Sequence, residues 1–207
     1  MSAEPNISAE AEALLAKLPA ISRPLIAKYF RSDFDVLQKA DDSPVTIADK
    51  SVEAALRAAI TQRFPDHSII GEEEGGQASQ PYCWVIDPID GTRAFIIGKP
   101  LFGTLIALSY QGMPICGLID MPGLDETYIT RGGEAFLLSG GQEKKLATRQ
   151  TDILANAHIA TTSPEALTDR GWQVFQKLGA ACRSTHYGGD CYNYALLAAG
   201  HLDLVVE

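Results

Sequence analysis

The spacing of apolar positions is helical in the first part of the chain and strand-like further on. Apolar residues at helical spacing across 7–30 predict a helix that Pro19 and Pro24 kink or divide. A second helix is predicted from Thr46, whose hydroxyl can cap it, to Pro65, which ends it. The apolar face of this second helix is expected to lie against the core.

Short apolar runs separated by Gly- and Pro-containing turns follow, and this pattern is typical of successive β-strands. A series of strands after two helices favours an α+β layered sandwich over alternating βαβ units. The predicted strands comprise residues 68–71, 83–87, 102–110, 115–120, 127–130 and 134–138.

The remainder of the chain begins with a polar stretch at 140–151 that contains Gly140-Gly141. This stretch predicts a boundary between an N-terminal lobe, 1–145, and a C-terminal lobe, 146–207. The chain stops on an apolar run, so we expect the second lobe to be incomplete. The elements predicted in that lobe are a strand at 153–160, a helix from Pro164 to Leu178 capped by Ser163, a strand at 181–185, a helix at 191–199 closed by Gly200, and a strand at 202–207.

The composition is that of a globular protein, with 207 residues of which 46% are hydrophobic and 21% charged. The net charge of −9 opposes binding to nucleic acid and to anionic membranes, so neither partner is expected. It would also repel a small phosphorylated metabolite, unless bound cations reverse the sign locally. Four cysteines without a CxxC pair, and an acidic N-terminus unlike a secretory signal, predict a cytoplasmic protein with reduced thiols.

Acidic side chains gather at the ends of two predicted strands. Glu72 and Glu73 follow the strand at 68–71, and Asp87 and Asp90 lie at the end of the next one. Successive strands are neighbours about two-thirds of the time, so we expect these carboxylates to converge. Hard oxygen ligands without His or Cys nearby favour Mg²⁺ or Mn²⁺ over zinc. The sequence therefore predicts a site for divalent metal ions.

The backbone between and after the two aspartates adds to this site. Pro88 stiffens the turn, so that both carboxylates and the Ile89 carbonyl can face a common point. Gly91 and Thr92 then open a helix whose free N–H groups suit a phosphate.

Each of these features also has an interpretation without a metal. The triplet Glu72-Glu73-Glu74 can be a solvated acidic turn, and Asp beside Pro and Gly is common in turns. Asp49, on the second predicted helix, adds another acid and favours the metal. The acids lack the spacing of an EF-hand. The Asp-x-Asp-Gly-Thr motif of haloacid-dehalogenase-type phosphatases fits badly, because its two Asp are two positions apart rather than three.

Three motifs resemble, in order and spacing, those of the inositol monophosphatase superfamily. The resemblance covers nearly the whole chain. It implies a sandwich of alternating α and β layers, hydrolysis of a small phosphate monoester with two or three Mg²⁺ ions (Mn²⁺ as an alternative), and a homodimer. The motifs are Asp42-Ser43-Pro44-Val45-Thr46-x-Ala48-Asp49, Gly71-Glu72-Glu73 and Trp84-x-Ile86-Asp87-Pro88-Ile89-Asp90-Gly91-Thr92.

Within that superfamily, the run from Asp90 to Leu108 is more similar to the histidinol-phosphate phosphatases than to the inositol enzymes. Gly188-Gly189-Asp190-Cys191-Tyr192 and the run from Ala198 to Glu207 point the same way. The resemblance therefore implies hydrolysis of histidinol phosphate in histidine biosynthesis. Two alternatives stay open: a monophosphatase acting on inositol, sugar or nucleotide phosphates, and a truncated homologue without catalysis.

The resemblance also implies roles for individual residues. Asp49 and Thr92 would orient or deprotonate the attacking water, and the Gly91 and Thr92 amides would hold the phosphate. Asp190 and Glu207 would contact the polar remainder of the substrate. The superfamily pattern continues with a Trp-Asp pair and an Ala-Gly-Gly run that this sequence does not contain, so a second metal is expected to bind poorly. The implied metal ligands are Glu72, Asp87, the Ile89 carbonyl and Asp90.

Overall fold

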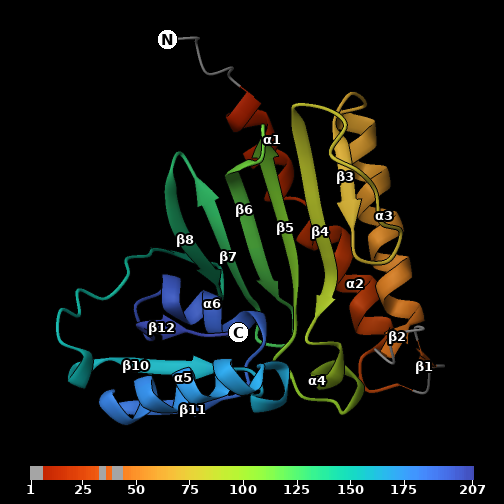
Figure 1. The fold of residues 1–207 in the computed structure, drawn as a ribbon. Coiled ribbons are helices and arrows are strands. Elements are labelled where there is room, and N and C mark those ends of the chain that lie inside the picture. The colour runs from red at the N-terminus through yellow and green to blue at the C-terminus, as the bar shows by residue number, and fades with distance from the viewer. Residues whose placement is uncertain (1–6, 33–35, 39–43) are drawn as a thin grey trace.

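The computed structural model describes residues 7–32, 36–38 and 44–207, except for the side chains of residues 7, 8, 36–38 and 44–46. The largest element is a seven-stranded sheet whose strands lie in chain order (Figure 1). They are β3 (Ser68–Gly71), β4 (Tyr82–Asp90), β5 (Gly103–Tyr110), β6 (Met113–Met121), β7 (Glu126–Arg131), β8 (Glu134–Ser139) and β9 (Gln142–Lys145). β3 and β4 are parallel, and all later neighbours are antiparallel.

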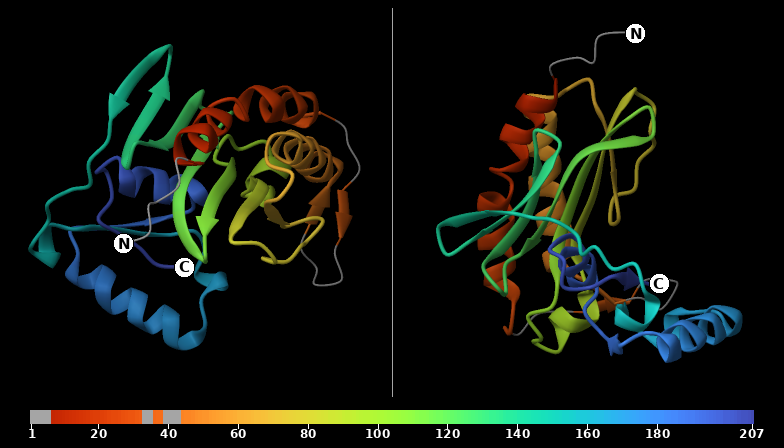
Figure 2. Two further views of the ribbon diagram at one scale, coloured as in Figure 1. Left: turned by 90° about the horizontal axis from the view of Figure 1, so that it is seen from above. Right: turned by 90° about the vertical axis from the view of Figure 1, so that its left-hand side faces the viewer.

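Helices α1 (Ile7–Leu15), α2 (Pro19–Tyr29) and α3 (Ile47–Arg63) cover one face of this sheet (Figure 2). The apolar face predicted for α3 does pack against the sheet, where its side chains join the main core with Trp84 and Ile86 of β4. The burial of these apolar side chains is the main force holding the helices to the sheet.

The first predicted helix is divided, as its prolines suggested. Pro19 stands in the first turn of α2, where a missing N–H leaves no hydrogen bond unmade. Pro24 lies inside α2 without ending it. Beyond α2, β1 (Val36–Gln38) and β2 (Pro44–Thr46) form an antiparallel pair that leads into α3. The predicted cap at Thr46, together with Asp42 and Ser43 of the first motif, lies outside the described residues and side chains.

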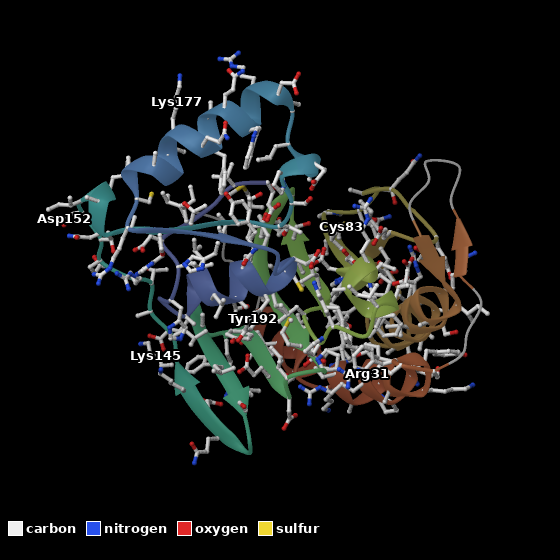
Figure 3. The ribbon with its side chains drawn as sticks, turned by 90° about the horizontal axis from the view of Figure 1, so that it is seen from below. Arg31, Cys83, Lys145, Asp152, Lys177 and Tyr192 are labelled. Carbon is white, nitrogen blue, oxygen red and sulfur yellow. The ribbon has the colours of Figure 1, made fainter. Side chains whose placement is uncertain are left out.

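Three further layers lie against the other face of the large sheet. Helix α6 (Cys191–Ala198) packs on it, with Cys191 and Ala195 in an apolar cluster with Met121. Figure 3 shows Tyr192 of α6 between the large sheet and the layer of α5, which carries Lys177. The chain thus alternates helix, sheet, helix, sheet, helix, which confirms the predicted layered sandwich. The outer layers are a parallel sheet in the order β11 (Ser184–Tyr187), β10 (His158–Thr161), β12 (Leu204–Val205), covered by α5 (Asp169–Ala181).

Several boundaries differ from those expected. β9 lies inside the stretch predicted as a boundary, because an exposed strand rich in Lys and Glu carries no apolar alternation. Helix α5 begins at Asp169 and is capped by Thr168, whose hydroxyl accepts the Gly171 N–H at 3.1 Å; the cap predicted at Ser163 was wrong. A 3₁₀ turn at Leu154–Asn156 replaces the start of the strand predicted at 153–160. The division into lobes at residue 145 stays a prediction, although β9 ends the large sheet there.

Two further features concern the cysteines and the helices. All four cysteines are free thiols, as predicted, and Cys182 is the one that is not buried. Within the described residues, no helix combines the length and the apolar composition that crossing a membrane requires.

An aromatic stack at the edge of the large sheet holds His67 in a neutral state. The ring lies between Phe64 and Tyr82, with centroids 4.6 and 4.8 Å away. Its Nδ1 accepts a hydrogen bond from Trp84 Nε1 at 3.0 Å, so that nitrogen must be unprotonated. Burial lowers the pKa of His67 below its ordinary value, against the opposing charge of Asp66.

Because the pKa of His67 is lowered by folding, the unfolded chain binds the proton more readily than the native protein does. We therefore expect the stability due to neutral His67 to be present above its unfolded pKa, near 6.5, and to be lost as pH falls from there through the folded pKa. Thermal unfolding between pH 8 and 5 measures this. His67→Phe keeps the stack and removes the titration, so the difference in Tm between the two proteins should change across this range; a constant difference would contradict the assignment.

Candidate metal centre

The parallel pairing of β3 with β4 brings two of the predicted acids together. The register aligns Gly71 with Ile86, and the Glu72 N–H donates to the Ile86 carbonyl at 3.2 Å. Glu72 and Asp87 are the next residues along the two strands, so they lie side by side where β3 ends. The expectation that these strands are neighbours is confirmed.

A β-bulge places Asp87 and Asp90 on the same face of β4. In a regular strand side chains alternate, so residues three apart point to opposite faces. Here the pairs Asp87–Leu105 and Asp90–Gly103 set four residues of β4 against three of β5, and the extra residue restores a common face. The bulge suits Pro88, which has no N–H to give to the ladder.

Side chains on both sides hold the bulge in place. The Thr104 hydroxyl donates to the Pro88 carbonyl at 2.8 Å. On the facing layer, the Cys191 N–H at the start of α6 donates to Asp90 Oδ2 at 2.6 Å. Asp87 borders the space beside the same helix. The bulge therefore presents both aspartates toward α6.

Asp49 adds a carboxylate from the first turn of α3, where it is 2% exposed. Burial first, and the surrounding carboxylates second, raise the pKa of Asp87 to about 9. Those carboxylates are Glu72, Asp90 and Asp49. Asp49 is buried, Asp87 and Asp90 are half-buried and Glu72 is exposed, so the cluster opens to solvent on the Glu72 side.

The cluster suits a hard divalent cation in its chemistry. The raised pKa of Asp87 shows that its ionised form is disfavoured among the neighbouring carboxylates, and a positive charge beside it would favour that form. Asp87 Oδ1 is also buried without a hydrogen-bond partner in the described part of the chain, which is costly unless an ion or water binds it. As the side chains stand, however, no three His, Cys, Asp or Glu among the described residues form a group that could hold a metal. A cation would therefore have to draw these carboxylates inward.

The turn after the bulge needs a glycine. Gly91 has φ +82° and caps α4 (Thr92–Ile96), the short helix expected at this point. A Cβ at Gly91 would lie 3.0 Å from the Leu101 carbonyl oxygen and 3.2 Å from Asp190 Cβ, so any side chain would crowd both. The Thr92 hydroxyl donates to the Ile89 carbonyl at 2.9 Å. The predicted phosphate-binding amides thus lie directly beside the predicted metal ligands.

The two acids predicted to contact the substrate also lie near this turn. Burial first, then the charges of Asp90 and Glu207, raise the pKa of Asp190 to about 6. The Glu207 carboxylate accepts two hydrogen bonds from Thr162, one from its N–H at 3.0 Å and one from its hydroxyl at 2.9 Å. The structure therefore brings Asp190 and Glu207 to the Asp90 side of the cluster.

Sequence reasoning missed four charged residues around the site. Lys99 and Arg93 are exposed cations whose charges oppose the rise in the pKa of Asp190. Glu53 is fully buried one helical turn after Asp49 and pairs with Arg57 at 2.8 Å. The i, i+4 spacing from Asp49 to Glu53 and on to Arg57 was the available signal.

An apolar cavity of about 470 Å³ lies between the large sheet and α6. Its walls are almost entirely hydrophobic, and Asp87 lies at its border. A phosphate placed inside would lose its hydration without gaining hydrogen bonds, so this cavity is not the candidate site.

A sandwich of alternating layers, with carboxylates gathered at the end of its parallel strand pair, defines the class of protein. The chain belongs to the inositol monophosphatase family, whose model matches residues 9–207. The structure matches that of an inositol monophosphatase from Zymomonas mobilis with a TM-score of 0.82 and 41% identity, covering 96% of this chain and 76% of the other.

Two relatives of known sequence are also similar. The chain is 43% identical over 221 aligned positions to the bifunctional phosphatase IMPL2, chloroplastic, of Arabidopsis thaliana, covering 100% of this chain and 63% of that protein. It is 34% identical over 185 positions to a histidinol-phosphatase of Chlorobaculum parvum, covering 88% of this chain and 71% of that protein. The chain thus spans less than two-thirds of the Arabidopsis relative.

Burial, together with the neighbouring carboxylates, predicts that Asp87→Asn stabilises the metal-free protein. The substitution replaces a carboxyl group whose ionised form the native structure disfavours, as its raised pKa shows, with a neutral group. We expect an increase of about 1–3 kcal/mol in the free energy of unfolding in chelator, since one pKa unit corresponds to about 1.4 kcal/mol. Added Mg²⁺ should raise the Tm of the wild type and not that of the variant.

The matched control is Glu134→Gln, which removes a carboxylate from an exposed ion pair with Lys145 and should leave stability nearly unchanged. Lower stability of Asp87→Asn than of the wild type in chelator would show that the carboxylate is not strained in this cluster.

Proposed function

We propose that the protein is a Mg²⁺-dependent hydrolase of small phosphate monoesters. The observation that carries the proposal is the convergence of Glu72, Asp87 and Asp90 at the end of one strand pair. Membership of the inositol monophosphatase family supports it. Because the protein has a net charge of −9, a phosphate monoester needs cations at the site to overcome long-range repulsion.

Each residue of the candidate site has a proposed role in hydrolysis. When bound, Mg²⁺ supplies electrostatic stabilisation of the phosphoryl group and makes water more acidic. Asp49 accepts the proton of the attacking water, a role worth on the order of 10²–10⁴-fold in rate. The Thr92 hydroxyl, fixed by its bond to the Ile89 carbonyl, keeps its oxygen available as an acceptor for that water. The Gly91 and Thr92 amides hold the phosphate. The groups that would hold Mg²⁺ are Glu72, Asp87, the Ile89 carbonyl and Asp90.

Histidinol phosphate is the proposed substrate. It carries an amine and an imidazole beside its phosphate, and Asp190 and Glu207 offer negative charge to such groups on the Asp90 side of the cluster. The similarity to the Chlorobaculum histidinol-phosphatase supports this choice. Inositol phosphate is the second candidate, because the Zymomonas inositol monophosphatase is 41% identical to this chain. The homodimer, the cytoplasmic location and the number of bound ions stay predictions.

Release of inorganic phosphate tests the proposed activity. We expect the full-length protein to hydrolyse histidinol phosphate in Mg²⁺ and to lose that activity in excess chelator. Asp87→Asn should lower kcat/KM by about 100-fold or more, since loss of a ligand removes transition-state stabilisation. Glu134→Gln is the control and should keep full activity. Equal turnover in chelator would refute the metal-dependent mechanism.

Removing the charge of Asp190 tests whether histidinol phosphate is the substrate. Asp190→Asn removes a half-buried carboxylate and should raise KM for histidinol phosphate about tenfold, the size of one charge-assisted hydrogen bond. KM for inositol phosphate should change much less, because inositol carries no cationic group. Asp169→Asn on α5 is the control. An equal rise in KM for both substrates would show that Asp190 does not bind the amine of histidinol phosphate.

A further inference from the structure

Glu53 is a fully buried carboxylate on α3 whose hydrogen bonds go to the turn that carries Glu72. Its Oε2 accepts the Glu73 N–H at 2.7 Å, and its Oε1 accepts the Glu74 N–H at 3.1 Å. Oε1 also accepts Arg57 Nε at 2.8 Å. The charge of Glu53 is thus matched by one guanidinium and two peptide groups.

Arg57 completes the attachment from the same helix. Its Nη2 donates to the Gly75 carbonyl, and its Nε lies 3.5 Å from the Glu74 carboxylate. Gly71 and Gly75 close the turn on itself with two reciprocal backbone hydrogen bonds of 2.9 and 3.1 Å. A Cβ at Gly71 would lie 1.9 Å from Glu53 Oε1, so the carboxylate reaches the turn only because position 71 is glycine.

Glu72 needs such an anchor more than the other acids do. Asp87 and Asp90 belong to a strand and its bulge, which the sheet and Thr104 hold rigid. Glu72 is exposed and lies one residue beyond the end of β3, outside the regular strand. The hydrogen bonds from the N–H groups of residues 73 and 74 to Glu53 restrict the backbone that follows Glu72. The hydrogen bond from the N–H of Glu72 to the Ile86 carbonyl restricts the backbone that precedes it.

We propose that Glu53, with Arg57, is a positioning residue that holds Glu72 at the metal centre through the turn at residues 71–75. The inference rests on the proposed function, since it assigns Glu53 to the same site. A group that orients a metal ligand without touching the metal changes metal affinity by about 10–100-fold when it is removed. A purely structural anchor would change stability alone.

The test compares two matched pairs of a buried carboxylate and its arginine. Arg57→Ala removes the partner of buried Glu53, and Arg23→Ala removes the partner of Asp120, which is equally buried and paired at 2.9 Å. Both variants should lower Tm. We expect the Kd for Mg²⁺, measured by calorimetry on the full-length protein, to rise about 10-fold or more for Arg57→Ala and to stay within about twofold for Arg23→Ala.

Substitutions of Glu53 itself make the test independent of turnover. Glu53→Ala should weaken Mg²⁺ binding more than Glu53→Gln, which keeps one acceptor oxygen for the turn. In chelator, amide hydrogen exchange at residues 73 and 74 should speed up in both variants, because their N–H groups lose the carboxylate that protects them. Glu53→Gln is the variant to use if Glu53→Ala does not fold.

The outcomes separate this inference from the proposed function. A wild type that binds Mg²⁺, with Glu53 variants that bind it equally well, overturns the positioning role and leaves the phosphatase proposal standing. A wild type without affinity for Mg²⁺ overturns the proposed function and, with it, this role. Unchanged amide exchange at residues 73 and 74 overturns the anchoring by itself.

Discussion

The feature on which the site depends is the forced proximity of like charges at the end of the parallel strand pair. Glu72, Asp87 and Asp90 are brought together by backbone register, and burial first, then the charges of these neighbours, raise the pKa of Asp87 to about 9. The fold can bear this cost because the layers on either side are well packed, with Trp84 and Ile86 of the same strand in the main core. A cation bound beside Asp87 would favour its ionised form, so the affinity of the site for a cation is coupled to the loss of a proton from this carboxyl group.

The parts of the fold that the sequence predicted are those that carry regular burial. The apolar face of α3, the proline that begins α2 and the alternating strands from β4 to β8 all follow from periodicity. Strand β9 was not predicted because both of its faces are exposed and polar. Its residues form ion pairs from Arg131 to Glu143 and from Lys145 to Glu134. The start of α5 was predicted at the wrong residue because Ser163 and Thr168 both offer a capping hydroxyl. The backbone conformation between them decides which one caps the helix.

The candidate site was predictable in its residue types and less so in its geometry. The motifs named Asp49, Glu72, Asp87 and Asp90, and the structure brings these four together. The bulge could not be read from the sequence, because Pro88 also fits a plain strand end. For Glu53 the sequence offers only the i, i+4 spacing to Asp49 and Arg57, which surface helices also show, and its burial depends on where the turn at 71–75 lies. Tertiary contacts, rather than local pattern, decide such roles.

The strand order also has a consequence for how the molecule assembles. From β5 to β9 each strand pairs with the next one along the chain across a short connection, so this meander can close with little loss of chain entropy. β3 pairs with β4 in parallel and must dock from across the ten residues that separate them, with α3 packed alongside. Glu72 therefore meets Asp87 and Asp90 only when that docking is complete. The charges of Glu72 and the two aspartates are then expected to come together late in folding, after the meander has formed, and a cation in solution would stabilise that last step rather than the first.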